Sequence, residues 1–130
     1  MNNSRIVTAP DNDLDNRFKV LLVDVEWADV ERLSNSIQAL GIEVTLFLYG
    51  SNDNDDMWCI NASKHAYATL INCRFTGNKE LVKGFLLSQK NCWALGQSEI
   101  GSLTHRNVFD IYSWLVLQYN NYVKEENNGI

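Results

Sequence analysis

Short apolar runs alternate with amphipathic stretches along the chain. A short run that is almost wholly apolar is typical of a strand covered on both faces, and apolar residues three or four positions apart are typical of a helix packed on a sheet. The pattern predicts strands over 18–25, 42–49, 66–73 and 91–95. It predicts helices over 28–40, 57–64, 78–89 and 107–123.

Strands that alternate with helices predict an α/β fold with a mostly parallel sheet. We expect three layers, with helices on both faces of a sheet of four or five strands. Numbered along the chain, the four predicted strands take the flavodoxin-like or Rossmann-like order 2-1-3-4. The polar ends of the chain, 1–16 and 125–130, read as flexible tails around a single domain over 17–124.

Composition agrees with one well-packed domain, because 45% of the 130 residues are hydrophobic. The three cysteines, Cys59, Cys73 and Cys92, are odd in number and share no CxxC spacing, so we interpret them as reduced thiols in the core. No apolar run approaches the ~20 residues of a membrane span, and 1–16 lacks the pattern of a secretion signal. The sequence therefore predicts a cytoplasmic protein with no membrane partner.

Charge is unevenly distributed along the chain, whose net charge is -5. Residues 1–63 carry eleven acidic and four basic side chains, whereas 64–106 carry two acidic and six basic ones. The acidic half argues against binding to duplex nucleic acid, where affinity comes largely from neutralised phosphates. Lys79, Lys83 and Lys90 are open to two interpretations, a solvated helix face or a surface near a small anionic ligand.

The sequence lacks the residues that several kinds of catalytic or metal site require. Counted as a calcium loop from Asp53, the chain has Trp58 where glycine is needed and Lys64 where glutamate is needed. His65 and His105 are the only histidines, without a GxSxG or HExxH motif beside them. There is also no phosphate-binding glycine motif, so the sequence predicts neither a metal nor a cofactor.

A phosphorelay receiver needs acidic residues after its first strand and an aspartate at the end of its third. Asp24 and Glu26 meet the first requirement, but Asn72 occupies the region of the aspartate. We therefore do not expect a phosphorylated protein, although the scaffold can be similar.

Polar side chains follow the predicted strands, where the carboxyl ends of a parallel sheet form a crevice. Carboxylates there can hold ribose hydroxyls or a base edge, and Arg74 can hold an anionic group. Thr76 and Asn78 are equally explained as caps of the helix that follows. The predicted ligand-binding residues are Asp24, Glu26, Trp27, Arg74, Thr76, Asn78, Gln97 and Ser98.

The segment 62–96 resembles the nucleoside 2-deoxyribosyltransferase group of small Rossmann-like domains. Thr76-Gly77 matches the polar loop of that group, Glu80 approximates its catalytic glutamate, and Gln89-Lys90-Asn91 replaces its Gly-Lys-Pro turn. The resemblance implies a nucleoside or nucleotide ligand, with Glu80 acting at the glycosidic carbon. The apolar stripe of the same predicted helix points away from Glu80, so whether the chain is an enzyme stays open.

The alternative is a non-catalytic regulatory or assembly module. The predicted helix 107–123 is apolar nearly all round, as a deeply buried helix or a homo-oligomer interface would be. One face of this helix includes Leu115, and the other face includes Trp114, Leu117 and Tyr122. The many asparagines are typical of an AT-rich genome, such as that of a phage or mobile element.

Overall fold

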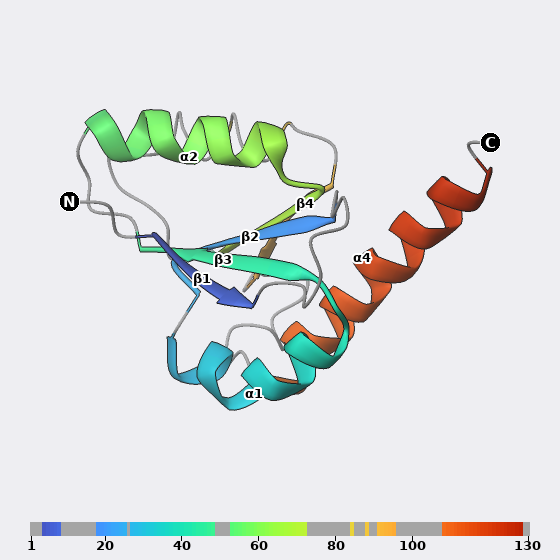
Figure 1. Cartoon of the computed structure of the whole chain (residues 1–130). Helices are drawn as coiled ribbons and strands as arrows, with labels where there is room; N and C mark the ends of the chain where they lie inside the picture. Colours follow the sequence, from blue (N-terminus) through green and yellow to red (C-terminus); the bar gives the residue numbers. More distant parts are fainter. Residues whose placement is uncertain are drawn as a thin grey trace.

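A computed structural model of the chain describes residues 4–8, 18–25, 27–48, 53–72, 84, 88, 91–95 and 108–128 (Figure 1). Within these segments, three helices accompany one five-stranded sheet. The strands are β1 (Ser4–Thr8), β2 (Lys19–Val23), β3 (Glu43–Phe47), β4 (Ala68–Asn72) and β5 (Cys92–Leu95). The helices are α1 (Trp27–Ala39), α2 (Asp53–His65) and α4 (Val108–Asn128).

The sheet is mixed but mostly parallel, which confirms the predicted α/β class. Its order is β1-β3-β2-β4-β5, with parallel pairing of β2 to β3, β2 to β4, and β4 to β5. β1 alone pairs antiparallel, along β3. The sheet differs from the predicted four-stranded order 2-1-3-4 by the additional strand β1, which lies at one edge beside β3.

The strand β1 lies in the segment 1–16, for which the sequence predicts a flexible tail. Val7 packs against the core, while the neighbouring Ile6 is 62% exposed. Since Val7 is only partly buried, this short strand is stabilised chiefly by its backbone pairing to β3. β1 thereby covers the edge of β3, which would otherwise present unpaired backbone groups to solvent.

Helices cover both faces of the sheet, so the fold has three layers (Figure 1). Alternate side chains of β2, β3 and β4 enter two separate cores, as the period of a strand requires. The core on the α1 and α4 side contains Phe18, Val20, Leu22, Val25, Val30, Leu33, Ile37, Ile42, Val44, Leu46, Ala68, Leu70, Ile111 and Leu115. The core on the α2 side contains Leu21, Val23, Phe47, Cys59 and Ile71.

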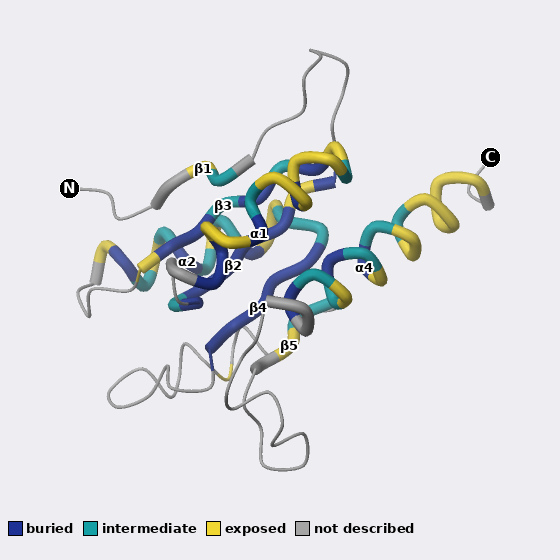
Figure 2. Tube along the Cα trace, turned by 90° about the horizontal axis from the view of Figure 1, so that it is seen from below, coloured by how far each residue is buried: buried dark blue, intermediate teal, exposed yellow. Residues whose placement is uncertain are grey.

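The helix α4 continues to Asn128, five residues past the predicted end at 123, and its second half projects from the body of the fold (Figures 1 and 2). An aromatic cluster anchors this half: Phe18, Tyr67, Tyr119 and Tyr122. Its ring centroids lie 5.0–5.4 Å apart in the contacting pairs. The Tyr67 hydroxyl also donates a hydrogen bond to Glu125 Oε2 over 2.9 Å.

The two faces of α4 are less alike than the sequence predicts. Ile111 and Leu115 are fully buried, and Trp114 and Tyr122 also pack against the core. Leu117 is 54% exposed. The surface available to a partner is therefore smaller than an all-apolar helix would offer.

Two other predicted helices can be compared with the structure only in part. The predicted helix 57–64 begins earlier, at Asp53, so Asp53, Asp55 and Asp56 lie in its first turn. Of the predicted helix 78–89, only Gly84 and Ser88 are described, and the Ser88 N–H donates to the Gly84 carbonyl over 3.1 Å. The rest lies outside the described residues. None of the described helices is long and apolar enough to cross a membrane.

Candidate functional site

The carboxyl ends of the four parallel strands meet at one edge of the sheet. The chain passes from β2 to β3 on one side of β2, and then from β3 to β4 on the other side. The strand order therefore reverses at β2. In open α/β sheets, ligands bind outside the carboxyl ends of the strands at such a reversal.

Asp24 follows β2 at this reversal and has a left-handed backbone, with φ of 58°. Its N–H donates to the Phe47 carbonyl over 2.9 Å, at the end of β3. Its own carbonyl accepts a hydrogen bond of 2.8 Å from Asn72 Nδ2, at the end of β4. Both neighbouring strands therefore fix the backbone of Asp24 in a conformation that residues other than glycine adopt only uncommonly.

A second carboxylate, that of Asp55, interacts electrostatically with Asp24. Asp55 lies in the first turn of α2 and is buried, and Asp24 is half-buried. Burial, and then the charge of Asp55, raise the pKa of the Asp24 carboxyl from 3.8 to about 6. Asp24 is therefore largely ionised at pH 7 and becomes protonated only slightly below it.

Asn72 occupies the position where a receiver domain would carry its aspartate. Only 4% of Asn72 is exposed, and its side-chain amide holds the main chain of Asp24. An amide is not a phosphate acceptor, and this one has a structural role. We call Asp24, Asp55 and Asn72 the carboxyl-edge site.

Cys59 interacts electrostatically with two members of the carboxyl-edge site, whereas Cys92 begins β5, and both thiols are poor nucleophiles. Burial raises the pKa of each of the Cys59 and Cys92 thiols to about 12, with the charges of Asp24 and Asp55 adding to the shift at Cys59. The thiolate is the reactive form of cysteine, so these two thiols are suited to packing. Cys73 lies outside the described residues.

The structure gives a position for only two of the predicted ligand-binding residues. It brings Asp24 to the reversal of strand order, and it shows that Trp27 begins α1 without describing the Trp27 side chain. The remaining predicted residues lie outside the described residues: Glu26, Arg74, Thr76, Asn78, Glu80, Gln97 and Ser98.

Sequence reasoning missed Asp55 as a member of the site and considered Asn72 only as a replacement for an aspartate. Asp55 lies in the acidic stretch 53–56, whose composition is typical of a loop. Its spacing of four residues to the buried Cys59 is a helical signal that would have placed both side chains on one face.

Within the described segments, no group of three or more His, Cys, Asp or Glu side chains is close enough to hold a metal ion. The carboxyl-edge site contributes two carboxylates and one buried amide. Carboxylates accept hydrogen bonds, so the site is suited to a ligand that carries hydroxyl or amino donors.

Comparisons of the chain with protein-family models, with curated proteins and with solved structures found no match. The resemblance of 62–96 to the nucleoside 2-deoxyribosyltransferase group stays a prediction.

Proposed function

We propose that this protein binds a nucleoside-like or nucleotide-like ligand at the carboxyl edge of its sheet. The observation that carries the proposal is the backbone of Asp24. It is held in the left-handed region by hydrogen bonds from β3 and β4, at the point where the strand order reverses. Residues whose backbone is held in a sparsely populated φ/ψ region by the surrounding structure cluster at ligand sites.

The chemistry of the two carboxylates favours the sugar or the base over the phosphate. Asp24 and Asp55 accept hydrogen bonds when ionised, and a ribose ring or an exocyclic amine offers donors. A phosphate group would be repelled by both charges. In a nucleotide, the phosphate would instead lie toward the basic segment after β4, where Arg74 is its predicted partner.

Thermal unfolding with a panel of nucleosides, nucleotides and dinucleotides tests the proposal. A ligand present at 100 times its dissociation constant, and bound only by the native state, adds about 2.7 kcal/mol, which raises the Tm of a domain of this size by roughly 10 °C. The shift is expected to disappear in Asp24→Asn, because asparagine tolerates the left-handed backbone but lacks the charge.

The matched control is Glu31→Gln, which removes an exposed carboxylate on α1 and should keep the full shift. Two results would refute the proposal: no shift with any member of the panel, or an equal shift in Asp24→Asn and in the unaltered protein.

A second candidate function is assembly through α4, and the exposure of Leu117 and Val123 on that helix favours it. It ranks below ligand binding, because Trp114, Tyr119 and Tyr122 pack against the core of the same chain. Light scattering distinguishes the two. Assembly predicts a mass above the 14.9 kDa of one chain that falls to 14.9 kDa in Leu117→Glu, whereas a monomeric unaltered protein would exclude it.

A further inference from the structure

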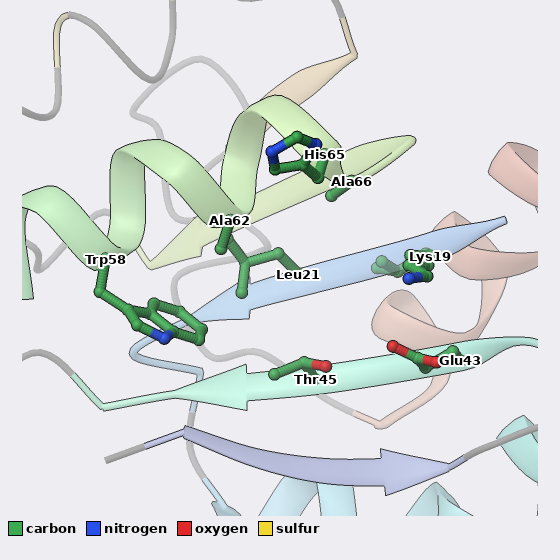
Figure 3. Close-up of a pocket in the computed structure, with 9 residues that line it drawn as sticks. Lys19, Leu21, Glu43, Thr45, Trp58, Ala62, His65 and Ala66 are labelled. Atoms are coloured by element: carbon green, nitrogen blue, oxygen red, sulfur yellow. The ribbon is translucent and has the colours of Figure 1, made fainter. Parts of the chain in front are cut away.

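A separate cavity of about 160 Å³ lies between α2 and the sheet (Figure 3). Lys19 and Glu43 begin β2 and β3, so the cavity extends toward the amino ends of the strands, whereas Asp24 follows the carboxyl end of β2. The residues that line the cavity include Trp58, Leu21, Ala62, Lys19, Glu43 and His65.

One half of the cavity is apolar. Trp58 and Ala62 project from α2 toward the sheet, and Leu21 of β2 lies beside them (Figure 3). The Trp58 ring is stacked on Phe47, with centroids 4.3 Å apart and planes 15° from parallel, so its position is fixed. This half therefore presents a rigid apolar wall to a ligand.

The size of the cavity limits what it can hold. An apolar cavity of about 150 Å³ accommodates a benzene molecule. A cavity of about 160 Å³ thus suits one aromatic ring or one branched aliphatic group.

The other half of the cavity is charged. Lys19 and Glu43 are direct neighbours in the parallel register of β2 and β3 and carry opposite charges. Among the described residues, no ion pair joins the two side chains. His65, in the last turn of α2, lies at the same end of the cavity (Figure 3).

We propose that this cavity binds a free α-amino acid with an aromatic or branched aliphatic side chain. The side chain fills the cavity against Trp58, and the charged head group lies at the solvent-exposed end, beside the exposed Lys19. The carboxylate of the amino acid pairs with the Lys19 ammonium, and its ammonium pairs with the Glu43 carboxylate. A zwitterion supplies both charges within one small head group, which an internal residue of a peptide or a phosphate does not.

Titration of the intrinsic fluorescence with phenylalanine and with leucine tests the proposal. We expect a saturable change that is lost in Trp58→Phe, because Trp58 lines the cavity. N-acetylphenylalanine lacks the ammonium and phenylalaninamide lacks the carboxylate, so each should bind at least tenfold more weakly than phenylalanine. Equal binding of either blocked compound would show that the cavity does not recognise a zwitterion.

Variants of the lining residues complete the test, with calorimetric titration as a readout that is independent of tryptophan. Ala62→Leu should fill the cavity and abolish binding, and Glu43→Gln should weaken it at least tenfold. Lys64→Met, which alters an exposed residue of α2 outside the lining, should leave it unchanged. Circular dichroism shows whether each variant is folded.

Absence of saturable binding by any apolar amino acid would overturn the proposal, and so would full binding by a folded Ala62→Leu variant. The outcome is independent of the nucleoside proposal. Asp24→Asn should leave amino-acid binding unchanged, and Ala62→Leu should leave any nucleoside-induced shift unchanged.

Discussion

The side-chain amide of Asn72 donates a hydrogen bond to the main-chain carbonyl of Asp24 over 2.8 Å, although the two residues are 48 positions apart in the chain. The end of β4 thereby holds the backbone at the end of β2. Because Asp24 is the central residue of the carboxyl-edge site, Asn72 sets the geometry of the site without itself being a charged group.

Removal of this hydrogen bond should destabilise the protein. Asn72→Ala leaves the carbonyl of Asp24 without its buried donor, and the expected loss in the free energy of unfolding is about 1–3 kcal/mol. Urea unfolding measures it. Asn61→Ala, at an exposed position of α2, is the control and should change the free energy by less than about 0.5 kcal/mol. Equal losses in the two variants would mean that the hydrogen bond contributes nothing.

The left-handed backbone of Asp24 predicts a ranking of two substitutions. Both Asp24→Gly and Asp24→Ala remove the carboxylate, but only alanine brings a Cβ atom into a conformation with φ of 58°. Asp24→Ala should therefore be less stable than Asp24→Gly by about 1 kcal/mol. Thermal or urea unfolding of the two variants side by side checks the ranking, and a more stable alanine variant would contradict it.

The raised pKa of Asp24 predicts a dependence of stability on pH. The folded pKa of about 6 lies above the unfolded value of 3.8, so the folded state binds more protons than the unfolded state between these values. The contribution of Asp24 to stability therefore falls as the pH rises from about 4 to about 6 and is constant above that. Since the carboxyl is only half-buried, we expect the total change to be about 1 kcal/mol.

The variant Asp24→Asn isolates this contribution from that of the other acidic residues. The free energy of unfolding of this variant minus that of the unaltered protein should be larger at pH 7 than at pH 4. Urea unfolding at intervals between pH 4 and 7 gives the difference. A difference that is independent of pH would show that Asp24 titrates as an exposed aspartate does.

The raised pKa values of Cys59 and Cys92 predict slow chemistry at both thiols. In a Cys73→Ser variant, which removes the remaining thiol, reaction with a disulfide reagent at pH 8 should be roughly a thousandfold slower than in urea, because little thiolate is present in the folded state. The absorbance of the thiol that the reagent releases gives the rate of modification. Rapid release of one equivalent from the folded variant would identify an accessible thiol.

The buried strands could be predicted from the sequence because their signal is local. Residues 18–25 are nearly all apolar, as a strand covered on both faces requires, and β2 lies within them. β1 could not be predicted in this way. Its stability depends on pairing with β3, about forty residues farther along the chain, and its own five residues include only two large apolar ones.

The same contrast between local and long-range signals applies to the candidate site. Asp24 could be found because it directly follows a buried strand and a parallel sheet brings such residues to one edge. The roles of Asp55 and Asn72 could not, because they depend on contacts with Asp24 across the fold. Asp55 also lies in a run of acidic residues whose composition favours a loop, whereas packing of Cys59 against the sheet makes the segment a helix.

The aromatic cluster has a consequence for the order in which the chain folds during synthesis. Phe18 is made well before its partners Tyr119 and Tyr122, which lie in α4. Ile111 and Leu115, which complete the core on the same face, are also made late. Until then the part of this face that α4 covers stays open to solvent, so a nascent chain of this protein depends on α4 to become aggregation-resistant.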